Sequence, residues 1–153
     1  MSIAQTFPAG GVPDCPPQID ALAIRANILA LEAAMRPMEQ IDCPLQHHYA
    51  PGLYAREILL PAGSLVVGKI HKHAHINVIS QGIAIVVTEF GRQRLIAPYT
   101  FVSEPGTKRT VIAETDVIWT TIHTNDDECR DPDALVERLT APDYDVLALE
   151  MQQ

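Results

Sequence analysis

Four histidines carry the chemistry that this sequence can offer. Three of them, His71, His73 and His75, alternate with other residues in one pentapeptide, and side chains at every second position of a β-strand point to the same face. Neutral imidazole is a common ligand of divalent metal ions. A strand that holds this pentapeptide therefore predicts a metal site, and the alternative is a histidine-rich strand that faces solvent and binds no ion.

The fourth histidine, His123, lies in the last segment that we predict to be a strand. Trp119 shares its face if that strand is regular. Three histidines that leave positions open for water or substrate are typical of a catalytic metal site, whereas a closed structural site normally has four ligands. The sequence holds neither a Gly-x-Ser-x-Gly motif nor a glycine-rich phosphate loop. The histidines are therefore the main candidate for an active centre.

Short strands must position these histidines. Turn residues divide the middle of the chain into about eight segments with the composition of strands. Short strands with no helices between them favour a sandwich or barrel over a parallel sheet, and closure into a jelly roll limits exposed sheet edges. The predicted strands are residues 53–60, 64–70, 73–80, 82–90, 92–96, 100–103, 109–113 and 117–124.

A helix is predicted before the strands and another after them. Ile24, Ile28, Leu31 and Met35 recur at helical spacing. This apolar stripe can pack on the chain's own barrel or on its copy in another subunit. After the strands, Asp131 can cap a helix that begins with a proline and has an apolar face.

We therefore predict four parts of the chain. Residues 1–17 are rich in proline and glycine and form a flexible arm. Residues 18–50 form a helical arm and linker, and residues 51–125 form the barrel. Residues 126–153 form a C-terminal helical tail.

Composition limits the classes of partner. The 153 residues carry a formal net charge of −8, which disfavours binding to nucleic acid. No apolar run approaches the roughly 20 residues of a membrane helix, and the start lacks the features of a signal peptide, so we expect a cytoplasmic protein with no membrane partner. The three cysteines form no Cys-x-x-Cys pair, which indicates free thiols.

The positions of the glycines and prolines between the predicted strands resemble the two motifs of the cupin superfamily. The turn at residues 61–63, the histidines and Gly82 resemble the first motif, and Gly91, Pro98 and the pair at residues 105–106 resemble the second. The resemblance implies an all-β fold, the double-stranded β-helix or cupin jelly-roll barrel, here with an N-terminal helix and a short C-terminal helix. It also implies a metal ion inside the barrel and a homodimer or higher homo-oligomer. The chain is also similar to small stand-alone cupins, hypothetical proteins of bacteria and tailed phages.

The sequence departs from the usual cupin ligands. With Gly82 aligned to the end of the first motif, His71 matches the second motif histidine and His75 takes the place of the glutamate; with His71 and His73 as the pair, the acid falls near Asn77. In the second motif, Arg109 replaces the histidine. The resemblance then suggests His71, His75 and His123 as ligands, with His73 in reserve, for a divalent ion such as Fe, Mn, Ni or Zn. An all-histidine triad resembles the ferrous sites of thiol dioxygenases.

Four further residues are candidates for contact with a bound molecule. The planar guanidinium of Arg109 suits a carboxylate or phosphate, and the alternative is a salt bridge from Arg109 to Glu104 or Glu114. Asn77 occupies the possible acid position. The aromatic residues Tyr54 and Trp119 can line the pocket or belong to the core.

Three functions compete at this stage. The first is a metal-dependent enzyme, dioxygenase- or isomerase-like, that acts on a small polar or anionic molecule in the barrel interior. The second is a non-catalytic module that binds or sequesters a small ligand. The third is an oligomeric structural protein with an inert barrel, in which residues 20–35 drive assembly. Fold alone does not decide among them.

Overall fold

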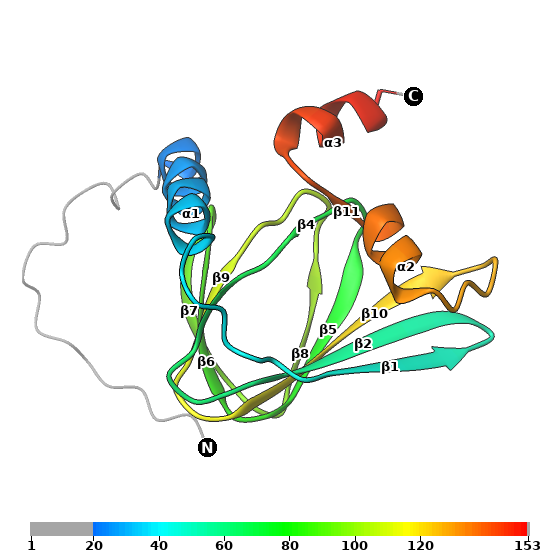
Figure 1. The fold of residues 1–153 in the computed structure, drawn as a ribbon, viewed down its shortest axis with the longest axis horizontal. Helices are drawn as coiled ribbons and strands as arrows, with labels where there is room; N and C mark the ends of the chain where they lie inside the picture. The colour runs from blue at the N-terminus through cyan, green and yellow to red at the C-terminus, as the bar shows by residue number, and fades with distance from the viewer. Residues whose placement is uncertain (1–19, 153) are drawn as a thin grey trace, which may run out of the picture.

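The computed structural model describes residues 20–152, which form a β-barrel of two facing sheets with three helices at one end (Figure 1). The larger sheet has the strand order β1-β2-β10-β5-β8 and the smaller one β3-β9-β6-β7. All of their pairings are antiparallel; β1–β2 and β6–β7 are consecutive in the sequence, and the other neighbours come from distant parts of the chain. This is the predicted jelly roll. The predicted arm at residues 1–17 lies outside the described residues.

The strand bounds follow the turn residues closely. The larger sheet contains β1 (Leu45–Ala50), β2 (Gly52–Leu60), β10 (Val117–Asn125), β5 (His75–Gln81) and β8 (Tyr99–Ser103). The smaller sheet contains β3 (Leu65–Val67), β9 (Thr110–Ala113), β6 (Ile83–Thr88) and β7 (Gly91–Ile96). A separate ribbon pairs β4 (Ile70–His71) with β11 (Thr140–Ala141).

An apolar core fills the end of the barrel away from the helices. Its buried members come from both sheets and point inward at alternate positions of their strands. They are Leu60, Ile79, Ala84, Val86, Leu95, Val111, Ala113, Val117 and Trp119. Because this core fills only part of the interior, polar side chains occupy the rest of the space between the sheets.

Helix α1 (Ala21–Met35) packs on the chain's own barrel. Asp20 caps it by accepting a hydrogen bond from the backbone nitrogen of Ala23. Ile28 from the predicted apolar stripe is buried. The buried ammonium of Lys108 lies 3.0 Å from Glu32, and Arg25 lies 2.6 Å from Glu89. Of the two packing alternatives, the structure shows the intramolecular one.

Two short helices complete the open end of the barrel. Asp131 caps α2 (Pro132–Leu139), as predicted, and Leu135 and Leu139 pack against Tyr54 of β2. Helix α3 (Tyr144–Glu150) packs through Leu147 on the β4–β11 ribbon. None of the helices in residues 20–152 combines the length and the apolar character required to cross a membrane.

The structure differs from the expected parts of the chain in two places. Residues 45–50 are not a linker but strand β1, which pairs along its full length with β2. The predicted strand at residues 64–70 is divided into β3 and β4, which pair with different partners. Both differences arise because strand pairing depends on distant segments, which local composition does not reveal.

Gly82 provides a test of the tight turn between β5 and β6. Its φ is +91°, and a Cβ there would collide with the backbone of Asp116, whereas Gly63 has a φ of +79° with open space around it. We expect Gly63→Ala to lower the free energy of unfolding by about 1 kcal/mol, from backbone strain alone. Gly82→Ala should lower it by at least about 3 kcal/mol, because the collision adds to the strain. Urea unfolding of both variants checks this, and equal effects would contradict it.

Candidate metal centre

The histidine pentapeptide is not one continuous strand. His71 ends β4 and His75 begins β5, and residues 72–74 belong to neither strand. The expectation that all three histidines share one strand face is therefore wrong, because the chain bends between two differently paired strands. His73 is exposed at the bend and lies outside the histidine cluster.

His71, His75 and His123 converge in the barrel interior. One ring nitrogen of each lies within 4.8 Å of the corresponding atom of the others. The ring centres of His71 and His75 are 4.1 Å apart, and His123 lies 4.8 Å from His75 and 5.4 Å from His71. Nitrogen ligands around a tetrahedral ion are separated by about 3.4 Å, as bond lengths near 2.1 Å require. A small inward movement of the rings would therefore let them share one ion.

The hydrogen bonds of the cluster leave nitrogen lone pairs free. The Nδ1 of His75 lies 3.2 Å from the backbone oxygen of His73. A carbonyl oxygen can only accept, so this Nδ1 carries the proton and Nε2 is a bare acceptor. That Nε2 and the Nδ1 of His71 are both buried without a hydrogen-bond partner among the described residues. Metal-binding histidines commonly donate their other ring N–H to a carbonyl in this way.

Burial keeps the cluster uncharged. It lowers the pKa of His71 to about 2 and that of His123 to about 4, and the neighbouring His75 ring adds to both effects. Burial also lowers the pKa of His75. Metal ions bind the neutral form of imidazole, so all three rings are ready to coordinate an ion at neutral pH.

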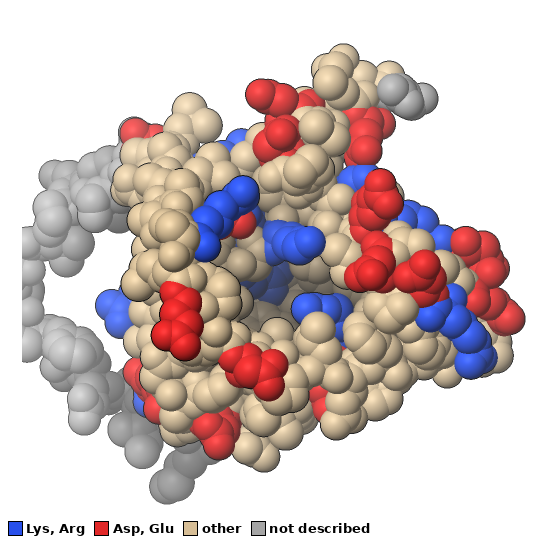
Figure 2. Space-filling model, viewed as in Figure 1, with Lys and Arg blue, Asp and Glu red and all other residues tan. Residues whose placement is uncertain are grey.

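A cavity of about 380 Å³ leads to the cluster from beneath α2. Its lining includes Tyr54, Arg56, Thr121, His71 and His123. A second cavity of about 670 Å³ between the three helices shares four lining residues with it, so the two cavities are adjacent. Figure 2 shows this face as a hollow with Lys and Arg atoms inside it.

Solved structures of other proteins share this architecture. Ectoine synthase from P. lautus is 11% identical and aligns over 68% of this chain and 78% of its own, with a TM-score of 0.53. An RmlC-like cupin from Shewanella frigidimarina is 20% identical over 61% of this chain and 84% of its own, with a TM-score of 0.48. A cupin domain from Bordetella pertussis is 16% identical over 57% of this chain and 98% of its own, with a TM-score of 0.46. The chain has a cupin fold.

Because the sequence identities are low, the similarities concern the fold alone, and of the three structures ectoine synthase is the one with a TM-score above 0.5. The predicted all-β cupin barrel with a helix before it and a short helix after it is thereby confirmed. No protein-family model and no curated protein matches the sequence. The likeness to cupins of tailed phages stays a prediction.

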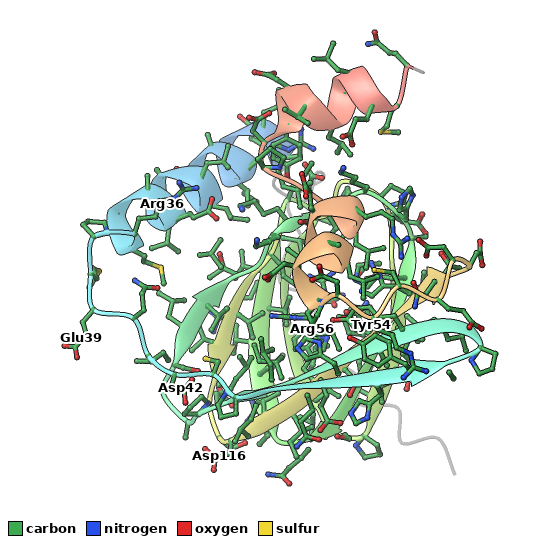
Figure 3. The ribbon with its side chains drawn as sticks, turned by 45° about the vertical axis from the view of Figure 1, so that its right-hand side comes forward. Arg36, Glu39, Asp42, Tyr54, Arg56 and Asp116 are labelled. Atoms are coloured by element: carbon green, nitrogen blue, oxygen red, sulfur yellow. The ribbon has the colours of Figure 1, made fainter. Side chains whose placement is uncertain are left out.

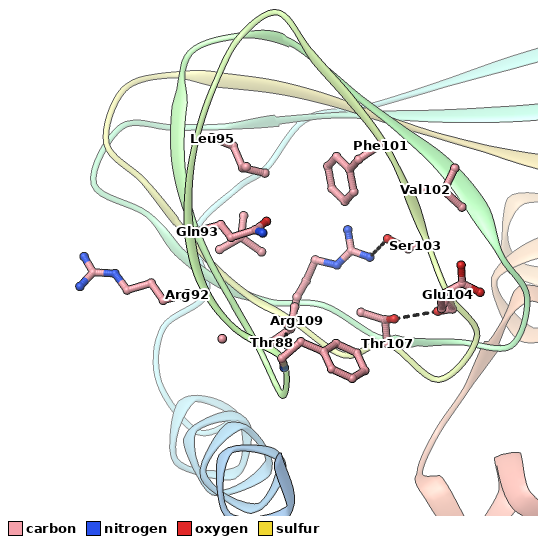
Figure 4. A pocket seen from close by; sticks show the side chains of 13 residues that line it. Thr88, Arg92, Gln93, Leu95, Phe101, Val102, Ser103, Glu104, Thr107 and Arg109 are labelled. Carbon is pink, nitrogen blue, oxygen red and sulfur yellow. Dashed lines mark hydrogen bonds between the residues drawn. The ribbon is translucent and has the colours of Figure 1, made fainter. Parts of the chain in front are cut away.

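Arg109 lies inside the barrel, and no carboxylate within residues 20–152 pairs with it. Its guanidinium donates to Asn77 Oδ1 at 3.0 Å and to Ser103 Oγ, and burial lowers the pKa of Arg109 to about 10. The alternative salt bridge to Glu104 or Glu114 is wrong, since neither carboxylate pairs with it and Glu114 pairs with Arg94 at 2.7 Å. Arg109 instead lines a separate cavity of about 390 Å³ (Figure 4).

Asn77 and Trp119 hold this arginine in place. The indole Nε1 of Trp119 donates to Asn77 Oδ1 at 3.0 Å, and the amide of Asn77 donates to Ser103 Oγ at 2.9 Å. Asn77 has no exposed surface. The hydrogen-bonding groups of both residues are thus used within the network, which favours a role in positioning Arg109. Their contact with a bound molecule stays a prediction.

Tyr54 lies where a pocket residue was expected. Its ring packs against His123 with ring centres 6.3 Å apart, and its hydroxyl lies 2.7 Å from His47 Nδ1 on β1. Burial raises the pKa of Tyr54, so at neutral pH the hydroxyl keeps its proton. The tyrosine therefore connects the histidine cavity to a histidine on the edge strand.

Two residues of the site were not anticipated from the sequence. Arg56 lines the histidine cavity, and Ser103 joins Asn77 to Arg109. Period-two alternation with Tyr54 could have placed Arg56 on the same face of its strand. No local pattern marks Ser103, because its partners are distant in the sequence.

The lowered histidine pKa values predict how the metal-free protein responds to pH. The unfolded chain takes up a proton on each histidine near pH 6.5, whereas folded His71 and His123 remain neutral well below it. The unfolded state then binds more protons, so stability falls as the pH falls. Each ring contributes up to about 1.4 kcal/mol per pH unit below pH 6.5.

The midpoints of urea unfolding, measured in EDTA between pH 7 and pH 5, give this loss of stability. Most carboxyl groups titrate below this pH range, so they contribute little to the change. His123→Gln should reduce the slope, because its side chain takes up no proton in the unfolded state. An unchanged slope in His123→Gln would show that His123 is not held neutral.

Proposed function

We propose that this cupin barrel binds a divalent metal ion through His71, His75 and His123 and uses it in a reaction of a small polar or anionic molecule. The observation that carries the proposal is the convergence of three neutral imidazoles, two of which bury a ring nitrogen with no hydrogen-bond partner. A buried polar atom without a partner is unfavourable unless something satisfies it. A metal ion bound by both of these ring nitrogens would satisfy them at once.

The donor set indicates the class of ion. Imidazole ligands suit Fe, Mn, Ni and Zn, and three of them leave coordination positions open. When bound, such an ion polarises a substrate oxygen or lowers the pKa of a coordinated water. The carbonyl of His73 would orient the ring of His75 through its hydrogen bond. Tyr54, hydrogen-bonded to His47, would hold a proton at the wall of the cavity.

A binding module without catalysis is the second candidate. Asp133 is the one carboxylate that lines the histidine cavity among residues 20–152, and it is also shared with the outer cavity. With Gly82 aligned to the end of the first cupin motif, His75 takes the place of the motif glutamate. Within residues 20–152 no carboxylate belongs to the histidine cluster itself, which favours ligand binding over reactions that need a carboxylate base next to the cluster. Recovery of a bound molecule chemically unchanged would distinguish this candidate from the enzyme.

The structural alternative receives less support. It depended on α1 as the assembly element, and the buried face of α1 is directed toward the chain's own barrel. The oligomeric state implied by the cupin resemblance stays a prediction.

Substitution of the cluster tests the metal site. Tag-free protein reconstituted with Fe(II), Mn(II), Ni(II) or Zn(II) should retain one ion per chain, measured by elemental analysis after gel filtration. His75→Ala and His123→Ala should each weaken binding by at least about 100-fold, since loss of even an outer hydrogen-bond partner of a ligand costs 10- to 100-fold.

Two exposed histidines supply matched controls. His48→Ala changes a side chain on β1 that lies 4.0 Å from Glu57. His73→Ala removes a ring outside the cluster and leaves the backbone carbonyl that bonds His75. Both variants should bind metal as the wild type does. Equal loss in all four variants, or no retained ion in the wild type, would contradict the proposed site.

A further inference from the structure

We propose that Arg56 is the anion anchor of the histidine cavity and that the guest molecule carries a carboxylate or phosphate group, which Arg56 binds while the rest of the molecule faces the histidines. This inference rests on the proposed function, because it names the substrate class of the same site. It replaces Arg109, the residue that the sequence suggested for this role.

The position of Arg56 follows from the alternation of β2. Tyr54 and Leu60 of this strand are buried, and Ile58 packs against the core, so the same face of β2 points into the barrel. Arg56 belongs to this row and is paired in register with Thr121 of β10, while Tyr54 is paired with His123. In Figure 3, Arg56 and Tyr54 lie together between β2 and α2. The guanidinium thus shares the inner face with the imidazole of His123.

Arg56 has no partner for its charge among residues 20–152. The guanidinium takes part in no salt bridge and donates no hydrogen bond there, whereas Arg109 donates to Asn77 and Ser103. Burial lowers the pKa of Arg56, which reflects the loss of hydration around an uncompensated charge. Retaining such a charge in the barrel is unfavourable. A ligand that offers two acceptor oxygens would compensate it, because the planar fork of arginine binds carboxylate or phosphate in two places.

The charge of the cavity agrees with an anionic guest. Its lining includes Arg56 and Lys69 against the single carboxylate of Asp133, although the whole chain has a net charge of −8. The three histidines add no positive charge at neutral pH, because burial lowers their pKa values. A positively charged pocket in an acidic protein concentrates small anions at one place.

One molecule in the cavity could meet both groups, because both line it. Arg56 and the two histidines His71 and His123 line the same cavity of about 380 Å³, a size within the range of small-molecule sites. A guest held by its acidic group at Arg56 would therefore present its remaining atoms to the histidine nitrogens.

Anion titration of the full chain tests the proposal. Inorganic phosphate and malonate are titrated calorimetrically at constant ionic strength in chloride, first into EDTA-treated protein and then into Zn(II)-loaded protein. The metal-free form isolates the arginine, because anions can also bind an ion directly. We expect at least one of the two anions to bind both forms, and the tighter one assigns the guest to carboxylates or to phosphate compounds.

Variants of Arg56 decide whether that residue is responsible. Arg56→Gln should weaken binding to the metal-free form at least about tenfold, from the loss of charge-assisted hydrogen bonds. The anion affinity of Arg56→Lys should lie between those of the wild type and Arg56→Gln. Lysine keeps the positive charge but lacks the planar guanidinium that donates two parallel hydrogen bonds. The control is Arg94→Gln, which removes an exposed arginine paired with Glu114 and should bind as the wild type does. In anion-free buffer, Arg56→Gln should be at least as stable as the wild type, since no partner is left unpaired.

The outcomes separate this inference from the metal site. Normal Zn(II) content in Arg56→Gln, together with weakened anion binding, supports the inference. Unchanged anion binding in Arg56→Gln, or no saturable binding of either anion to the wild type, overturns it even where the ion is retained. If the protein retains no metal ion but binds anions in a way that depends on Arg56, Arg56 is supported as the anion anchor. Only the proposed metal site is then contradicted.

Discussion

The site depends on the burial of three uncharged imidazole rings against one another. Imidazoles this close repel each other when protonated, and burial makes protonation still less favourable, so His71, His75 and His123 remain neutral. Neutral rings have lone pairs to offer. Two buried ring nitrogens, His71 Nδ1 and His75 Nε2, have no hydrogen-bond partner among the described residues, so the cluster leaves them available to a ligand.

Two arginine side chains lie in the barrel interior, and they differ in their hydrogen bonding. Arg109 is held by Asn77 and Ser103, and Trp119 fixes Asn77 in turn. This network satisfies both terminal nitrogens of the Arg109 guanidinium within the barrel, beside the separate cavity of about 390 Å³ that Arg109 lines. Arg56 faces the cavity with its donors free among residues 20–152. The same residue type thus has its hydrogen bonds satisfied internally at one position and open to the cavity at the other.

The helices belong to the site as much as the strands do. Helix α2 packs Leu135 and Leu139 on Tyr54, which in turn packs on His123. The short strand β11 that follows α2 pairs with β4 and so positions His71. Helix α1 is attached to the barrel through the buried Lys108, which also donates to the carbonyl of Gly68 at 3.0 Å. The open end of the barrel is thus framed by segments from both ends of the described chain.

The sequence by itself determined the jelly roll, the helix cap at Asp131, and the histidines as the centre of interest, because turn residues, capping residues and period-two alternation are local signals. It could not show that the pentapeptide bends at His73, since that bend arises from the pairing of β4 with β11.

Only the tertiary structure decided that Arg109 is hydrogen-bonded within the barrel and that Arg56 has its donors free among residues 20–152. On β2, both faces carry a mixture of apolar and charged residues, so alternation alone does not tell which face is inside. The pairing of Arg56 with Thr121, and of Tyr54 with His123, settles this through contacts between residues far apart in the chain. Such contacts are set by strand register, and register is a property of the whole sheet.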